Sequence, residues 1–236
     1  MTVAHLPWPP LEPPPGNARF PNPEALGEEW VLGVTRGMTP GLVLQAYRAG
    51  IFPWPTQPGV VPWCSPEPRC VFPLERPGPW PRSVRRDLKV AADAGWIVSF
   101  DQAYGEVMRA CGERDEGTWI TPDIRATYQE LHQRGFGHSV EVWKPEPQGP
   151  ALIGGLYGLA VGALFAGESM FHRETGASKV AFAAMAGRLR QRGFSLFDVQ
   201  AHSDHLESLG CVLISRSEYL GRVRAAIQVE TRFSEP

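Results

Sequence analysis

The position of its prolines limits the folds open to this chain more than any other feature. Of the 24 prolines, eight lie within the first 23 residues, and a second group runs through residues 51–81 together with several tryptophans. Proline has no main-chain N–H and fixes φ, so neither segment can form a long helix. We expect the first segment to be extended or irregular. Within the second, near residue 63, we place a boundary between a small N-terminal domain (1–62) and a main domain (63–236).

Beyond this boundary the hydrophobic residues alternate between helical and strand spacing. Residues that can cap a helix N-terminus predict helices after Thr39, Ser83, Asp101, Thr121 and Ser217, with further helices at Lys179–Arg192 and Ser203–Leu209. Strands are predicted at Trp96–Phe100, His138–Trp143, Phe194–Gln200 and Cys211–Ile214, and the glycine-spaced apolar residues 151–171 predict two paired strands. The fold class is therefore mixed α/β (α+β), and a strand–helix–strand unit around residues 160–200 is its best-defined part.

Charge and composition exclude several classes of protein. The formal net charge is −2, so the chain does not bind by bulk positive charge, although local basic patches stay possible. It holds no apolar run of 18 residues and no visible secretory signal. The four cysteines, Cys64, Cys70, Cys111 and Cys211, form no CxxC pair, which favours a reduced, cytoplasmic protein.

Generic catalytic motifs are weak. His202 and His205 with Asp198 suggest a metal site, but no ligand spacing supports one, and helix capping by Ser203 together with surface histidines is the simpler explanation. A nucleophile elbow is absent. The loop Arg173–Ser178 follows a strand and opens a helix, and it half-matches the loop that holds the pyrophosphate of coenzyme A. Ser178 breaks the last position of that match, so simple helix capping is as good an explanation.

Two further features have both a functional and a structural interpretation. The segment Arg82–Lys89 holds four cations and one acid in eight residues, which fits a solvated helix face or a patch that contacts phosphates. Trp54 and Trp63 stand in proline-rich loops, where an aromatic ring either joins the core or serves as a stacking platform.

Seven blocks in order carry a family resemblance that runs from about residue 30 to 220. They are Tyr47–Trp54 (YRAGIFPW), Trp63–Arg69 (WCSPEPR), Glu116–Thr121 (EGTWIT), His138–Trp143 (HSVEVW), Gly167–Phe171 (GESMF), Ala177–Lys179 (ASK) and Asp198–Gln200 (DVQ). Together they resemble the leucyl/phenylalanyl-tRNA–protein transferases, the bacterial aminoacyltransferases of the N-end rule pathway. The chain departs from the family's usual entry to the first helix, where it has Val34–Pro40, and its proline-rich start has no assigned counterpart.

The resemblance implies a fold and an activity. The fold would be a small N-terminal domain joined to a main domain of the acetyltransferase (GNAT) type. The enzyme would move leucine or phenylalanine, and less readily methionine, from aminoacyl-tRNA to the α-amine of an N-terminal arginine or lysine of an acceptor protein. The product would enter N-end rule degradation. The resemblance implies a cytoplasmic enzyme that works as a monomer on its two substrates, aminoacyl-tRNA and the acceptor protein, without a metal, a cofactor or a membrane.

The resemblance also implies roles for particular residues. Asp198 would accept a hydrogen bond from the Gln200 carboxamide, whose oxygen would then accept a proton from the attacking amine. Glu168 would pair with the cationic acceptor peptide. Trp54 and Trp119 would flank the terminal adenosine or the aminoacyl group, Tyr47 and Tyr128 would add hydrogen bonds, and Arg85 and Arg86 would contact acceptor-stem phosphates. The candidate pocket for the donor side chain consists of Leu156, Phe165, Met170, Phe182, Met185, Leu189 and Phe197, which could equally be plain core.

Overall fold

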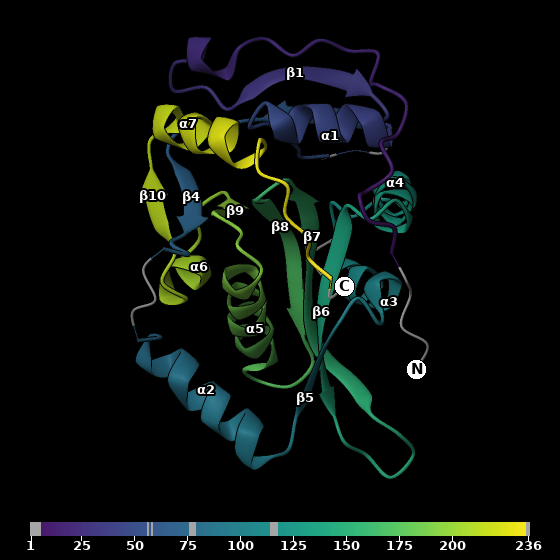
Figure 1. Cartoon of the computed structure of the whole chain (residues 1–236), viewed down its shortest axis with the longest axis vertical. Coiled ribbons are helices and arrows are strands. Elements are labelled where there is room, and N and C mark those ends of the chain that lie inside the picture. Colours follow the sequence, from purple (N-terminus) through teal and green to yellow (C-terminus); the bar gives the residue numbers. More distant parts are fainter. Residues whose placement is uncertain (1–5, 56, 58, 76–78, 114–117, 235–236) are drawn as a thin grey trace.

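The computed structural model describes residues 6–55, 57, 59–75, 79–113 and 118–234. The strands are β1 (Val31–Arg36), β2 (Phe52–Pro53), β3 (Val60–Cys64), β4 (Arg69–Phe72), β5 (Ile97–Phe100), β6 (Gly137–Lys144), β7 (Ala151–Val161), β8 (Leu164–His172), β9 (Leu196–Gln200) and β10 (Val212–Ile214). The helices are α1 (Pro40–Arg48), α2 (Arg82–Asp93), α3 (Tyr104–Gly112), α4 (Pro122–Gln133), α5 (Ala177–Gln191), α6 (Asp204–Ser208) and α7 (Arg216–Ala226). The architecture is thus the predicted mixture of helices and sheets (Figure 1).

The strands form two sheets. The smaller has the order β1-β3-β2, and the larger has the order β10-β4-β9-β8-β7-β6-β5. The described residues within the proline-rich range 51–81 form no long helix, as predicted, but they supply β2, β3 and β4, which the sequence pattern did not indicate. These strands are short, and their partners are distant in sequence, so no local hydrophobic period marks them. Along the chain, the last strand of the smaller sheet ends at Cys64 and the first strand of the larger sheet begins at Arg69. The domain boundary near residue 63 stays a prediction.

Some of the predicted helix N-caps are confirmed and others are wrong. Thr39 and Thr121 each cap a helix, accepting from the main-chain N–H of Leu42 and Ile124 at 3.3 and 3.4 Å. Three predicted caps are wrong: α2 begins at Arg82, before Ser83; α3 follows Ala103 rather than Asp101; and Ser215, not Ser217, caps α7. The Asp101 carboxylate instead accepts from the main-chain N–H of Ser139 and contacts His138 Nδ1, both at 2.8 Å.

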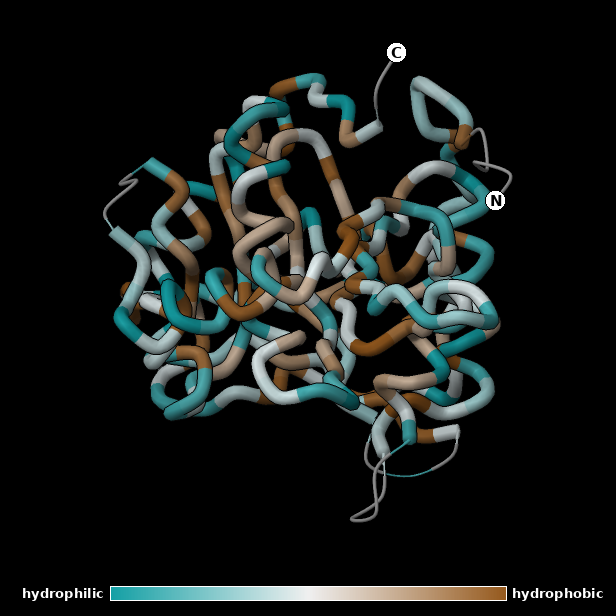
Figure 2. The backbone as a smooth tube through the Cα atoms, turned by 90° about the horizontal axis from the view of Figure 1, so that it is seen from below, coloured by the Kyte–Doolittle hydropathy of each residue, from teal (hydrophilic) through white to brown (hydrophobic). Residues whose placement is uncertain are grey.

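Helices cover both faces of the larger sheet. The predicted pair β7 and β8 forms its centre; α5 packs on one face, and α3 and α4 lie on the other. A Cβ added at Gly154 would lie 2.6 Å from the Ala177 Cβ, so this glycine lets α5 approach β7 closely. Figure 2 shows the hydrophobic residues gathered along the inner segments, with hydrophilic residues on the outer turns. Among the described residues, none of the helices combines the length and the apolar character needed to cross a bilayer.

Residues 6–22, the described part of the proline-rich segment before a short 3-10 turn at Pro23–Ala25, form no regular helix or strand, which agrees with the predicted extended or irregular conformation. The segment is tied to the rest of the protein by main-chain and side-chain bonds. Leu11 donates to the Arg134 carbonyl at 2.8 Å, and the guanidinium of Arg216 donates to the carbonyls of Leu26 and Glu29 at 2.7 and 2.8 Å. The described part of this segment therefore packs on the rest of the protein through specific hydrogen bonds.

The feature that positions the candidate site is a split between two neighbouring strands. Helix α5 connects β8 to β9, and these strands pair in parallel at Leu164 with Leu196 and at Ala166 with Asp198. In the described chain their pairing stops there, although β8 continues to His172 alongside β7 and β9 continues to Gln200 alongside β4. A split at the carboxyl ends of parallel strands opens a crevice, which is where α/β folds commonly bind ligands.

Candidate active site

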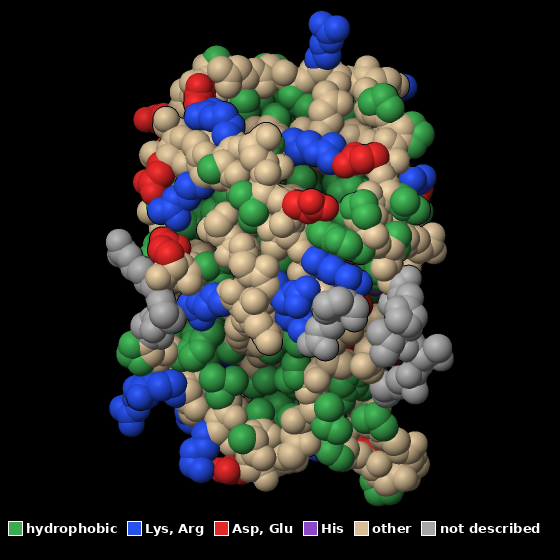
Figure 3. All heavy atoms as spheres, viewed as in Figure 1, with side chains coloured by type: hydrophobic (Ala, Val, Ile, Leu, Met, Phe, Trp, Pro, Cys, Tyr) green, Lys and Arg blue, Asp and Glu red, His purple; other side chains and the backbone are tan. Residues whose placement is uncertain are grey.

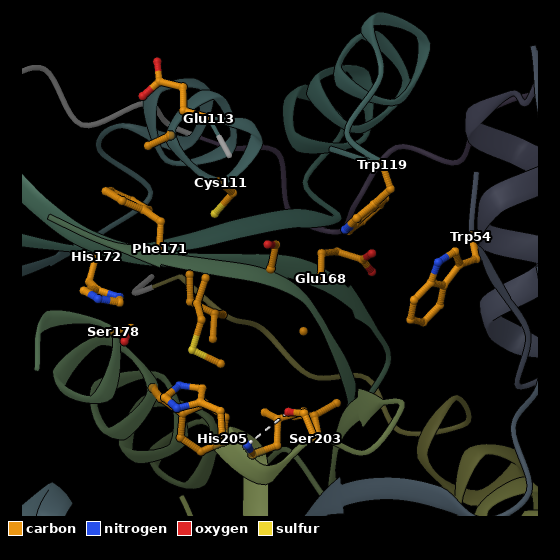
Figure 4. Close-up of a pocket in the computed structure, with 18 residues that line it drawn as sticks. Trp54, Cys111, Glu113, Trp119, Glu168, Phe171, His172, Ser178, Ser203 and His205 are labelled. Carbon is orange, nitrogen blue, oxygen red and sulfur yellow. Dashed lines mark hydrogen bonds between the residues drawn. The ribbon is translucent and has the colours of Figure 1, made fainter. Parts of the chain in front are cut away.

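Two adjoining cavities occupy the split between β8 and β9. The larger has a volume of about 630 Å³, and β8, the starts of α5 and α6, and the end of α3 form its walls. The smaller has a volume of about 220 Å³ and is bounded by Pro53 and by the end of β9. Trp54, Trp119 and Glu168 line both. Figure 4 shows the Glu168 carboxylate pointing toward the space between the two tryptophans.

Glu168 receives hydrogen bonds from three neutral side chains. Tyr47 donates to its Oε1 at 2.5 Å, Tyr128 to its Oε2 at 3.3 Å, and the Gln200 Nε2 to its Oε1 at 3.4 Å. Burial is the largest influence on this carboxyl and raises its pKa from 4.5 to about 7, although the hydrogen bonds act in the opposite direction. Burial also raises the pKa of both phenols, so they stay protonated as donors. Glu168 can therefore gain or lose a proton near neutral pH.

Asp198 is completely buried, and other groups occupy both of its carboxylate oxygens. Arg69 donates from Nε at 2.8 Å and from Nη2 at 2.6 Å, and the Tyr219 hydroxyl donates at 2.8 Å. Burial by itself would lower the pKa of Arg69, but Asp198 and Tyr219 raise it, so the guanidinium stays charged. The guanidinium lies over the rings of Phe52 and Tyr219, at 4.6 and 4.3 Å from their centres.

The expected contact between Asp198 and the Gln200 carboxamide is wrong. Asp198 Oδ1 accepts instead from the main-chain N–H of Gln200 at 2.9 Å, while the Gln200 side chain bonds to Glu168. Gln200 has a φ of 68°, which turns its side chain out of the regular alternation of β9, so it does not lie on the same face of the strand as Asp198. Asp198 thus holds the main chain of Gln200, and Gln200 holds Glu168. Their catalytic roles stay predictions.

Sequence reasoning gave no role to Arg69 or Tyr219, although both complete the site. Arg69 ends one of the seven blocks and stands in the otherwise apolar strand β4. A cation in an apolar strand needs an acidic partner, and that signal could have drawn attention to it.

The predicted donor pocket divides into two groups. Leu156, Met170 and Phe182 line the larger cavity and make one of its walls apolar. The other four, Phe165, Met185, Leu189 and Phe197, are fully buried in the core behind that wall. Contact between these four and a substrate stays a prediction.

The remaining predicted residues lie around the cavities. The first two residues of the block that carries Trp119 fall outside the described residues. Arg85 is exposed on α2, and Arg86 donates to Asp87 at 3.0 Å, which in turn pairs with Lys179 of α5 at 2.9 Å. Figure 3 shows basic side chains at the corner of the molecule where α2 lies in Figure 1.

Neither the metal nor the coenzyme A interpretation gains support from the geometry. Within the described part of the chain, no three acidic, histidine or cysteine side chains are grouped to hold a metal. The Arg173 guanidinium of the candidate coenzyme A loop donates to the Leu152 carbonyl at 3.0 Å and to Glu113 at 3.3 Å. The four cysteines are buried and form no disulfide.

A carboxylate, a carboxamide and two phenols thus meet beside an apolar wall at a split in a mixed sheet. Such a site offers a group that can exchange a proton, hydrogen-bond donors and an apolar surface, which together suit an enzyme active site. The fold is similar to that of FemX in its crystal structure, with a TM-score of 0.50 and 12% sequence identity, covering 64% of this chain and 60% of FemX.

Sequence comparison identifies the family. The family model for leucyl/phenylalanyl-tRNA protein transferase matches residues 75–224, and the model for the N-terminal domain of these transferases matches residues 37–67. A leucyl/phenylalanyl-tRNA–protein transferase of Azotobacter vinelandii is 47% identical over 194 residues, which cover 80% of this chain and 81% of that protein. One of Shewanella baltica is 43% identical over 212 residues, covering 87% of this chain and 85% of that protein. The chain belongs to the leucyl/phenylalanyl-tRNA protein transferase family, and it is an enzyme.

Proposed function

We propose that this enzyme transfers leucine or phenylalanine, and less readily methionine, from aminoacyl-tRNA to the α-amine of an N-terminal arginine or lysine. The modified proteins would enter N-end rule degradation, and the enzyme would work in the cytoplasm, where charged tRNA is made, as a monomer without a cofactor. The observation that carries this proposal is the position of Glu168 at the junction of two cavities, one of which has an apolar wall.

The larger cavity suits the donor. Leu156, Met170 and Phe182 would contact the side chain of the transferred amino acid. An apolar pocket distinguishes chains that differ by one methylene by only about 1–3 kcal/mol, so leucine, phenylalanine and methionine would all enter. A polar side chain would lose its hydration there without gaining hydrogen bonds. Trp54 and Trp119, which line both cavities, offer aromatic faces on which the terminal adenosine would stack.

The smaller cavity suits the acceptor. A peptide that begins with arginine or lysine carries a side-chain cation and an α-ammonium, and Glu168 would pair with one of these groups. Gln200 donates to Glu168 through Nε2, which leaves its carboxamide oxygen available to accept from the α-amine. Glu168 and Gln200 together would therefore select and orient a basic N-terminus.

The reaction is the aminolysis of an ester. The α-amine nitrogen would attack the ester carbonyl carbon, the resulting tetrahedral oxyanion would collapse, and the C–O bond to the ribose would break. The amine loses one proton and the ribose oxygen gains one. A carboxyl whose pKa is about 7 is suited to accept the first proton at cellular pH, and we assign that step to Glu168. Because Asp198 touches neither cavity, we assign it a positioning role through the main chain of Gln200.

The finer description of the fold also belongs to the proposal. We propose a main domain of the acetyltransferase (GNAT) type, which the split between the parallel strands β8 and β9 supports. Arg85 and Arg86 on α2 would contact phosphates of the tRNA acceptor stem.

A transfer assay with defined donors and acceptors tests the proposal. The full chain is incubated with radiolabelled leucyl-tRNA and with matched peptides that begin with arginine, lysine or alanine, or with an N-acetylated arginine. Label is expected in the first two only, because the reaction needs a basic residue and a free α-amine. Acetyl-coenzyme A serves as the alternative donor. Acetylation of the arginine peptide without leucine transfer would instead identify a coenzyme A-dependent acetyltransferase.

A further inference from the structure

The start of α5 forms one end of the larger cavity, and its first turn has free hydrogen-bond donors. Gly176 precedes the helix with a φ of 91° and has no side chain to cap it. Among the described residues, no acceptor is found for the main-chain N–H groups of Ser178 and Lys179. The N-terminus of a helix carries a partial positive charge, so unpaired N–H groups there favour an anion.

The side chain of Ser178 is a second and independent indication. Ser178 is only 5% exposed, yet it lines the larger cavity. Its hydroxyl has no hydrogen-bond partner in the part of the chain that the structure describes. Figure 4 shows Ser178 between His172 and His205 at the wall of the cavity. The residue is nearly buried while its hydroxyl faces the cavity, so the hydroxyl is available to donate a hydrogen bond to a ligand there.

Basic side chains also lie near this point, in a cavity whose other charged lining residues are Glu113 and Glu168. His172 and His205 line the same cavity, and Lys179 lies close enough that burial, Lys179 and His172 together lower the pKa of His205. Asp87 is the acid beside the turn, and Lys179 and Arg86 pair with it at 2.9 and 3.0 Å. Through Asp87 the turn is also joined to the basic helix α2. A phosphate seated at the turn would therefore be followed by further cations along α2.

We propose that the start of α5 is an anion subsite that binds the phosphodiester on the 5′ side of the terminal adenosine of aminoacyl-tRNA. The Ser178 hydroxyl and the main-chain N–H groups of Ser178 and Lys179 donate to the phosphate oxygens, and His172 and His205 flank them. The inference rests on the proposed function, which supplies the charged tRNA.

The position of the subsite fits such a ligand. His172 lies four residues beyond Glu168 on β8, a separation of about 13 Å at the rise of a strand. The ester would react beside Glu168, so this span leaves room for the aminoacyl group and the ribose between the reacting bond and the phosphate. The RNA chain would then leave the cavity over α5 toward Arg86 and Arg85.

Truncated donors separate this proposal from the proposed function. The donors are 3′-O-leucyl-adenosine, its 5′-monophosphate, and cytidylyl-(3′→5′)-adenosine that carries leucine on the 3′ oxygen of the adenosine. Each is offered with the arginine peptide. The two donors that carry a phosphate are expected to have a KM about tenfold lower than leucyl-adenosine, with kcat little changed, because charged hydrogen bonds to the phosphate add binding. Equal KM values for all three donors would overturn the subsite and leave the transferase activity intact. Absence of transfer from every donor, charged tRNA included, would overturn the proposed function.

Two variants locate the effect at Ser178. Ser178→Asp places a negative charge at the subsite and is expected to remove the tenfold gain, so that the KM values of this variant for the three donors become equal. Ser178→Ala keeps the main-chain donors and should lose only part of the gain. Ser217→Asp and Ser217→Ala, on the exposed side of α7, are the matched controls and should preserve it. A full gain in Ser178→Asp would refute the assignment.

Binding without reaction gives an independent test, which needs no variant. Cytidylyl-(3′→5′)-adenosine is titrated into the wild-type protein while the ring resonances of His172 and His205 are followed by NMR over a range of pH. The imidazole pKa of His205, which burial and the nearby cations lower in the free protein, is expected to rise when the phosphate binds, because a nearby anion favours the imidazolium. An unchanged pKa of His205 in the saturated complex would contradict the proposal. A rise with inorganic phosphate but not with the dinucleotide would show a free-phosphate site and would also contradict it.

Discussion

Asp198 and Glu168 stand on neighbouring strands at the same split of the sheet, and their surroundings are opposite in kind. Asp198 meets a guanidinium with both oxygens and receives two further hydrogen bonds. Glu168 meets only neutral donors, and burial raises its pKa to about 7. The first carboxylate is held in a buried ion pair with Arg69, and the second can exchange a proton at cellular pH. When two acids of one site differ in this way, their environments assign their roles.

The difference also explains why the two acids are not interchangeable. Breaking a buried ion pair leaves an uncompensated charge in the interior, so loss of Asp198 is expected mainly to lower the stability of the folded protein. Glu168 borders two cavities, which supports the proposal that its main effect is on the reaction. Gln200 joins them, through its main chain to Asp198 and through its side chain to Glu168.

The largest effect is expected from Asp198→Ala. It leaves the Arg69 guanidinium buried without its carboxylate, which typically costs about 3–5 kcal/mol of the free energy of unfolding. Urea unfolding followed by tryptophan fluorescence measures this cost, and transfer activity should fall with it. Asp93→Ala is the matched control, because it breaks the exposed pair with Lys89 and should cost less than about 1 kcal/mol. Equal costs for the two variants would remove the distinction between the two acids.

Glu168→Gln is expected to affect chemistry rather than stability. The amide keeps the size of the side chain but cannot accept the proton, so kcat should fall by about 10²–10⁴-fold. Single-turnover transfer from leucyl-tRNA measures the chemical step. Glu106→Gln, on the exposed side of α3, is the control and should be fully active. Near-normal turnover of Glu168→Gln would mean that Glu168 binds the peptide and takes no proton.

The pH dependence of stability sharpens the comparison further. The pKa of Glu168 is about 7 in the folded protein and near 4.5 in the unfolded chain, so the folded protein holds a proton between these values that the unfolded chain has lost. Its contribution to stability is present below pH 4.5 and is lost as the pH rises through 7. The wild type should therefore lose up to about 3 kcal/mol relative to Glu168→Gln between pH 4.5 and 8. If the urea-unfolding midpoints of the wild type and of Glu168→Gln changed with pH in the same way across that range, this prediction would be contradicted.

The smallest effects are expected from two variants that each remove one hydroxyl. Tyr47→Phe takes away a donor that lowers the pKa of Glu168, so the pH at which stability declines should move upward. Tyr219→Phe takes a donor from Asp198 and should cost about 1.5–3 kcal/mol without moving that pH, since hydrogen bonds to charged groups contribute about this much. Urea unfolding at several pH values measures both. An equal shift in the two variants would show that the carboxylates titrate as one unit.

Local signals in the sequence predicted the local parts of this structure. Threonine followed by proline marked the starts of α1 and α4, and the spacing of glycines marked the pair β7 and β8. Serine and aspartate alone misplaced three caps, since the chain geometry before each helix depends on packing. The short strands β1 to β4 gave no signal, because each depends on partners elsewhere in the chain.

The site was predictable where the family resemblance applied. Glu168, Gln200, Tyr47 and Tyr128 are hydrogen-bonded together, and two tryptophans of the predicted set line the same cavities. The partners of Asp198 could not be found by spacing, because Arg69 lies 129 residues before it and the strands are brought together only by the sheet. The turn at Gln200 was equally invisible, since a positive φ at a glutamine reflects its surroundings.

The central claim is that Glu168 titrates near neutral pH in the free enzyme. Its side-chain carboxyl resonance can be followed by NMR in protein labelled with ¹³C at glutamate Cδ, with Glu168→Gln identifying the signal. We predict a midpoint near pH 7. A midpoint below pH 5, the range of an ordinary glutamate, would contradict the account.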